Sequence, residues 1–217
     1  MMIERDRSVR LMHPMPGLRW TEFRDAAADC ASHGWPVLPG TYQLDGDTTW
    51  YGKPGAIGLE PAAAMWAMAS TTDTAVALAW WTRRPYSVLV ACGTAVDVIE
   101  VSADHGRRSW ARLAERGDLG PIVGTPFGRW LVLVRPGGEL RDELAADARL
   151  RARGEWVPVP PTARAGAAYR WIVHPTECSW TLPDPQRVQE SLIDGLAAPG
   201  ATSKSGANPA GEASDVD

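Results

Sequence analysis

The sequence predicts an α/β or α+β domain in which a mixed or antiparallel central sheet is flanked by helices. Helical patterns alternate with short apolar strands in the first half of the chain, and strand–turn–strand patterns dominate the second half. A chain of 217 residues is long enough for one domain with two lobes. We expect this domain to span residues 18–196, after a loose arm at residues 1–17 and before a disordered, Ala-, Gly- and Ser-rich tail at residues 197–217.

The first expected elements are a helix, a short strand and a long loop. Residues Arg19–His33 place apolar side chains on one helical face, and Gly34 follows at a position typical of a helix end. The segment Trp35–Pro39 predicts a short strand, which its prolines restrict to an edge or to its ends. Residues Gly40–Leu59 are rich in Gly, Asp and Thr and predict a surface loop of the kind that often carries function.

Two helices are expected before the central strands. The Ala- and Met-rich segment Glu60–Ala69 predicts the first of them. The second begins after Thr71-Thr72-Asp73, whose side chains are strong N-caps, and Pro85 ends it. This second helix leads directly into the stretch that carries the acidic side chains.

The stretch Ser87–Gly106 is expected to be the centre of the domain. It predicts a buried strand, a Gly-Thr turn and a second strand that carries Asp97 and Glu100 towards a polar end. Acids at the end of an apolar central strand are typical of positions that hold a metal or a substrate in an α/β enzyme. Because strand side chains alternate with a period of two, Asp97 and Glu100 are expected on opposite faces unless a bulge intervenes.

Hairpins are expected to dominate the remainder of the domain. The segments Pro121–Thr125 and Trp130–Val134 are short and apolar and flank a Pro-Phe-Gly-Arg turn, which predicts a hairpin. In chain order, the other expected elements are helices at His105–Arg116 and Glu139–Arg149, strands at Trp156–Val159 and Tyr169–Val173, and a last helix at Pro185–Leu196.

Composition argues against several classes of protein. No apolar run approaches the ~18 residues that span a membrane, and the charged N-terminus does not fit a signal sequence, so we expect a cytoplasmic protein without a membrane partner. The three cysteines form no CxxC pair, which argues against a disulfide framework and a structural zinc. No GxSxG elbow and no Walker loop appears. The net charge of −4 gives no global basic field for nucleic acid.

Five segments carry motifs that occur together and in a fixed order. They are AADCASHGWPVLPG (Ala27–Gly40), STTDTAVALAWWTRRPYSVLVACG (Ser70–Gly93), VDVIEVSADHG (Val96–Gly106), GPIVGTPFGRWLVLVRPG (Gly120–Gly137) and GEWVPVPPTARAGAAYRW (Gly154–Trp171). Together they resemble the bifunctional DNA primase/polymerase N-terminal (Prim-Pol) family of the archaeo-eukaryotic primase superfamily. The resemblance implies a two-lobed primase–polymerase-like domain and a role connected with DNA replication.

The resemblance also implies the chemistry of the acidic strand. In the family, two aspartates at positions i and i+2 and a third acid hold two divalent metals, and a histidine of the neighbouring hairpin meets the triphosphate. Here the two strand positions fall on Glu100 and Ser102, the histidine position on Trp130, and the third acid near Arg149. One of the three acids is retained conservatively, so we expect nucleotidyl transfer to be weakened or lost.

Two sets of candidate site residues follow from the resemblance and from residue chemistry. Arginine binds phosphate through two donors at once, and aromatic rings stack on bases. The candidate catalytic residues are Glu100 and Asp97, and the candidate metal ligands are Glu100, Asp104 and His105, with Mg²⁺ or Mn²⁺ as the cofactor of an active enzyme. The candidate contacts to nucleotide or nucleic acid are Arg129, Trp130, Lys53, Arg149, Arg151 and Arg153, each with a solvated or core position as the alternative.

Three functions remain open at the level of sequence. The first is a binding or accessory module for nucleotides or single-stranded DNA, working with replication or mobile-element proteins. The second is an active nucleotidyltransferase with a metal site rearranged from Asp97, Glu100, Asp104 and His105. The third is a protein-interaction domain that binds neither nucleotide nor DNA.

Overall fold

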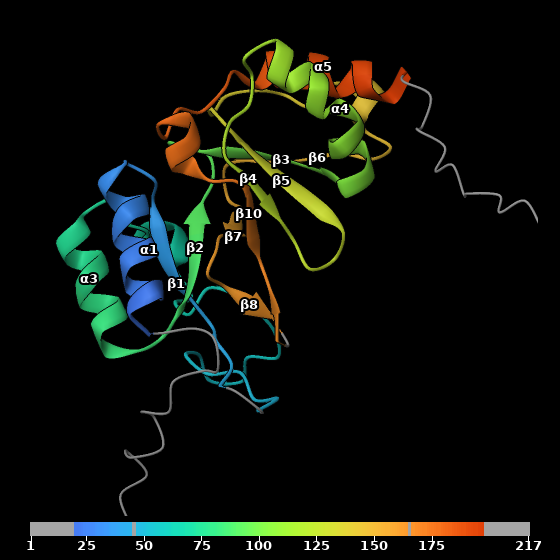
Figure 1. Cartoon of the computed structure of the whole chain (residues 1–217). Coiled ribbons are helices and arrows are strands. Elements are labelled where there is room, and N and C mark those ends of the chain that lie inside the picture. The colour runs from blue at the N-terminus through green and yellow to red at the C-terminus, as the bar shows by residue number, and fades with distance from the viewer. Residues whose placement is uncertain (1–19, 45–46, 165, 198–217) are drawn as a thin grey trace, which may run out of the picture.

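The computed structural model of the chain describes residues 20–44, 47–164 and 166–197. Over these residues the fold is a mixed α+β domain built from antiparallel sheets with helices on their outer faces, as the sequence predicts (Figure 1). None of the helices in this part of the chain is long and apolar enough to cross a membrane. The predicted arm at residues 1–17 and all but the first residue of the predicted tail lie outside the described residues.

A three-stranded antiparallel sheet with two helices forms the first lobe. Its strands are β1 (Val37–Gly40), β2 (Ser87–Ala91) and β7 (Trp156–Pro158), in that order across the sheet. Helices α1 (Trp20–Ser32) and α3 (Thr74–Arg83) lie side by side on it (Figure 1). The Asp73 carboxylate accepts hydrogen bonds from the first backbone N–H groups of α3, at 2.8 Å from Ala75 N, so the predicted N-cap is confirmed.

A five-stranded antiparallel sheet forms the second lobe. In order across the sheet its strands are β10 (Arg170–Val173), β4 (Ile122–Gly124), β5 (Arg129–Val134), β3 (Asp97–Ser102) and β6 (Arg149–Arg151). Helices α4 (Ala103–Glu115) and α5 (Pro185–Ala197) pack against each other over one face of this sheet (Figure 1). The shorter elements are α2 (Trp66–Ala69), β8 (Ala163–Arg164), β9 (Ala167–Ala168) and the 3₁₀ turns η2 (Asp142–Leu144) and η3 (Pro175–Cys178).

The central strand β3 presents its two faces to two different cores. Ile99 and Val101 are fully buried among side chains of α4 and α5. Val98 faces the other way, into the core that joins the two sheets and includes Val90 of β2. Because the side chains alternate along a regular strand, Glu100 lies on the Val98 face and Asp97 on the opposite face, as predicted.

The helix predicted at Glu60–Ala69 is wrong over most of its length, because only α2, its last four residues, is helical. The backbone of the first residues is used elsewhere. Pro61 forms an isolated bridge with Gly40, and Ala62 N donates to Pro39 O at 2.9 Å. Pairing with the edge of β1 therefore overrides the helix propensity of this Ala-rich segment.

The helix predicted at Glu139–Arg149 is also wrong. This segment contains only the short turn η2, and Arg149 begins strand β6, which pairs with β3 along the edge of the sheet. The small hairpin of β8 and β9 was not predicted either. These differences matter for function, because β6 and β8 both supply charged side chains to the cavity described next.

Candidate functional site

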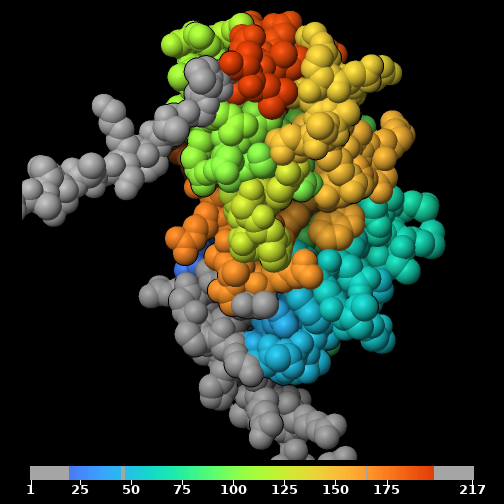
Figure 2. All heavy atoms as spheres, turned by 90° about the vertical axis from the view of Figure 1, so that its right-hand side faces the viewer, coloured from blue at the N-terminus to red at the C-terminus, as the bar shows by residue number. Residues whose placement is uncertain are grey.

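A cavity of about 400 Å³ lies where the two lobes meet. Its wall includes Leu131 of β5, Val157 of β7 and Leu59 of the long loop. Figure 2 shows the face on which the β4–β5 turn region, in yellow-green, lies next to the orange segment that contains β8 and β9. Polar and aromatic side chains complete the lining: Glu100, Phe127, Arg151, Glu155, Arg164 and Tyr169.

The Glu100 carboxylate faces this cavity and has a guanidinium bound to each oxygen. Its Oε2 accepts from Arg151 Nε at 2.9 Å and from Arg151 Nη2 at 2.7 Å. Its Oε1 accepts from Arg129 Nε at 3.3 Å. Only 16% of the Glu100 side chain is exposed, so both ion pairs are partly shielded from water.

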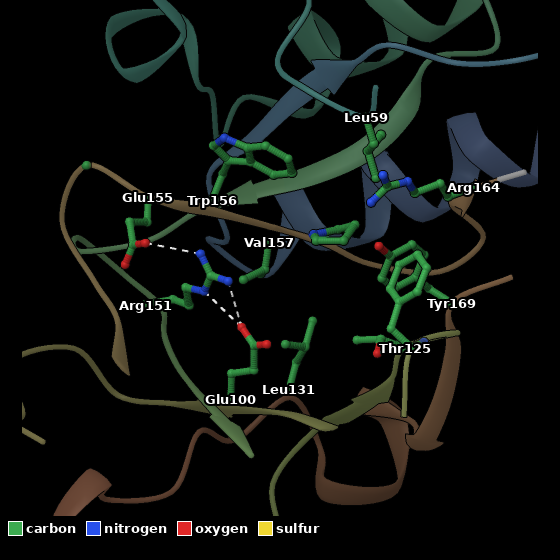
Figure 3. Close-up of a pocket in the computed structure, with 13 residues that line it drawn as sticks. Leu59, Glu100, Thr125, Leu131, Arg151, Glu155, Trp156, Val157, Arg164 and Tyr169 are labelled. Atoms are coloured by element: carbon green, nitrogen blue, oxygen red, sulfur yellow. Dashed lines mark hydrogen bonds and ion pairs between the residues drawn. The ribbon is translucent and has the colours of Figure 1, made fainter. Parts of the chain in front are cut away.

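Glu155 extends the ion-pair network along β6. It binds Arg149 Nη2 at 2.5 Å and Arg151 Nη1 at 3.2 Å, and Figure 3 shows Arg151 between Glu155 and Glu100. Arg153 is exposed and pairs with no described carboxylate. Two of the three arginines predicted to bind phosphate on this segment are therefore paired with acids of the protein itself.

Asp147, which precedes β6, is a site residue that the sequence did not reveal. Its Oδ2 accepts from Ser102 Oγ at 3.1 Å and lies 2.8 Å from His105 Nδ1, while Oδ1 lies 3.5 Å from Arg129 Nη1. Partial burial acts to raise the pKa of Asp147, but the hydrogen bonds from His105 and Ser102 outweigh it and lower that pKa below its usual range. The expectation of a third acid near Arg149 was the signal for it, because Asp147 lies two residues earlier.

The predicted ligands Asp104 and His105 do not converge on Glu100. Asp104 is exposed in the first turn of α4 and pairs with Arg107. His105 is fully buried, and its second ring nitrogen, Nε2, lies 2.8 Å from Leu192 O in α5. Both nitrogens of this imidazole therefore have partners within the protein.

Trp130 and Asp97 lie on the other face of the sheet from the cavity. Trp130 is 7% exposed and packs edge-on against Trp110 beneath α4. Asp97 is buried and accepts from Gly137 N at 3.0 Å, and burial raises the pKa of its carboxyl. Lys53 pairs with Glu60 at 2.5 Å and does not line the cavity. The structure thus brings none of these predicted contacts into the cavity.

The residues at this cavity do not fit a pair of divalent metals. Such a pair needs several carboxylates with free oxygens converging on one point. Here Glu100 is held by Arg129 and Arg151, and Glu155 by Arg149 and Arg151. Over the described ranges, no three His, Cys, Asp or Glu side chains are grouped so that they could bind a metal.

Two antiparallel sheets, helices on their outer faces and an acid of the central strand that faces the cavity between the lobes define a primase–polymerase type of domain. The family model for the bifunctional DNA primase/polymerase N-terminal domain matches residues 27–185, and the chain belongs to this family. The resemblance found in the five sequence motifs is therefore confirmed. No curated protein and no solved structure matches the chain.

Proposed function

We propose that this Prim-Pol domain binds nucleotides or single-stranded nucleic acid in the cavity and does not carry out two-metal nucleotidyl transfer. The observation that supports binding is the pair of Arg164 and Phe127 at the cavity. The Arg164 guanidinium lies 5.1 Å from the centre of the Phe127 ring. Arg164 is exposed, and no described carboxylate pairs with it.

These two side chains offer what a nucleotide needs. Phe127 is 57% exposed, so its ring is open to stacking by a base, and Arg164 can meet a phosphate through two parallel N–H donors. Tyr169 and Trp156 add aromatic surface deeper in the wall. The volume of about 400 Å³ is in the range of small-molecule sites.

The proposal that catalysis is absent rests on charge. A carboxylate that ligates Mg²⁺ must present a free oxygen to the ion, and an adjacent guanidinium repels that ion. Both oxygens of Glu100 already accept from arginine, and Ser102 supplies a hydroxyl in place of a second acid. The arginines of the cavity thus leave no carboxylate free for the chemistry that the family's acids perform.

The first test measures binding through tryptophan fluorescence, with nucleoside triphosphates and short single-stranded DNA at several salt concentrations. We expect binding that weakens as salt rises, because phosphate contacts release counterions. Arg164→Ala and Phe127→Ala should each weaken binding about tenfold, from loss of a phosphate contact and of base stacking. Arg107→Ala, an exposed arginine of α4 away from the cavity, is the control and should bind like the wild type.

The same preparations then enter a primer-synthesis and extension assay with Mg²⁺ and with Mn²⁺. We expect binding without incorporation. Incorporation that is lost in Glu100→Gln would contradict the proposal and support an active enzyme with a rearranged site. A protein that binds neither ligand at low salt would instead support the protein-interaction function.

A further inference from the structure

The guanidinium of Arg129 is enclosed by oxygen atoms of two other residues. Its Nε donates to Glu100 Oε1 at 3.3 Å and its Nη1 to Asp147 Oδ1 at 3.5 Å. Its Nη2 donates to two backbone carbonyl oxygens, Asp147 O at 2.7 Å and Glu100 O at 3.3 Å. The positive charge thus lies among two carboxylate oxygens and two carbonyl oxygens.

The sheet sets this geometry. In the β3–β5 ladder Arg129 stands opposite Ser102 and therefore diagonal to Glu100 on the same face. In the β3–β6 ladder Glu100 stands opposite Arg149, and Asp147 lies two residues before that pair. Three neighbouring strands therefore bring the arginine and the oxygen atoms to one place.

The oxygen atoms are held by partners other than Arg129. Arg151 binds Glu100 Oε2, while Ser102 and His105 bind Asp147 Oδ2. The two carbonyl groups belong to the backbone of β3 and of the segment just before β6. Removing the Arg129 side chain should therefore leave the four oxygen atoms close to their present positions.

Carboxylate and backbone carbonyl oxygens together are the ligands of hard cations such as Ca²⁺, Mg²⁺ and the lanthanides. We infer that the Arg129 guanidinium fills a cation site formed by Glu100 and Asp147, and that a variant without this side chain binds a hard metal cation there. In the natural chain the cation of the site is part of the protein. This inference does not depend on nucleotide binding, because its readout is the metal ion alone.

The experiment compares Tb³⁺ binding by the full-length wild type and by Arg129→Ala, through tryptophan-sensitised luminescence and calorimetry. We expect Arg129→Ala to gain one site that binds Tb³⁺ at least about tenfold more tightly than any site of the wild type, since a unit charge a few ångströms away is removed. The double variant Arg129→Ala/Glu100→Gln should lose that site. Arg129→Lys, which keeps the positive charge, should not gain it.

Several results would overturn the inference. They are equal Tb³⁺ affinity in the wild type and Arg129→Ala, an acquired site that survives Glu100→Gln, or a wild-type site that Glu100→Gln removes. Thermal unfolding shows whether Arg129→Ala folds. If it does not, Arg129→Gln takes its place with the same expectation, and Tb³⁺ binding no tighter than that of the wild type then contradicts the inference.

Discussion

Glu100 and Asp97 show how differently one strand can treat two acids three residues apart. Glu100 lies at the cavity, where two guanidinium groups compensate its charge. Asp97 is 2% exposed on the other face, and its Oδ1 is buried without a hydrogen-bond partner among the described residues. One acid is thus stabilised by its neighbours, and the other is buried at a cost in free energy.

The residue-scale prediction is that Asp97→Asn stabilises the domain at neutral pH, by about 1 kcal/mol, since it removes a buried charge with one partner. Burial raises the pKa of Asp97 in the folded state. The favourable contribution of its protonation is therefore present below the unfolded pKa and is lost as pH rises through the folded pKa. Urea unfolding of both proteins should show a difference at pH 7 that shrinks towards pH 4, and a constant difference would contradict this account.

At the scale of elements, the junction of α4 with β5 places Arg129 against Glu100. The Ser102 side chain caps α4 by accepting from His105 N, and Gly106 in the first turn lies against the ring of Trp130. A Cβ atom on Gly106 would lie 2.2 Å from Trp130 Cε3. The helix can approach the sheet this closely only because this residue has no side chain.

We expect Gly106→Ala to destabilise the domain by about 1–3 kcal/mol, because the overpacking of Trp130 exceeds the gain in helix propensity. Differential scanning calorimetry measures the change. Gly58→Ala is the control, since a Cβ there meets nothing within 4 Å, and it should change the midpoint little. Adding Trp130→Leu to Gly106→Ala should recover part of the loss, and no recovery would contradict steric overlap as the cause.

At the scale of the whole molecule, the cavity depends on contacts between segments far apart in sequence. Thr162, just after β7, is fully buried, and its hydroxyl binds both backbone groups of Val88 in β2, accepting at 2.9 Å and donating at 3.1 Å. This contact fixes the segment that leads to β8 and Arg164. The position of the proposed phosphate contact therefore depends on the first lobe as well as on the second.

The whole-molecule prediction concerns this contact. Thr162→Val keeps the shape of the side chain but leaves a buried N–H and C=O without a partner, so we expect a loss of about 1–3 kcal/mol in the free energy of unfolding. Thr162→Ser keeps the hydroxyl and should lose less. Urea unfolding gives both values. Equal losses in the two variants would show that the methyl group, and not the hydrogen bonds, matters here.

Local patterns were sufficient to predict the fold class, the acidic strand and the opposite orientations of Asp97 and Glu100. They predict these features because caps, turns and the period of two act over a few residues. The family, too, was recognisable from five short motifs, and the family model confirms it.

Local patterns did not reveal strand β6, the role of Asp147 or the loss of free carboxylates. Asp147 meets Ser102 and Arg129, which precede it by 45 and 18 residues, and Arg151 meets Glu100 across 51. A segment with helical propensity became a strand because the edge of β3 offered it backbone partners. Whether an acid can bind a metal depends on which cations the folded chain places beside it, and those cations come from strands that are distant in sequence.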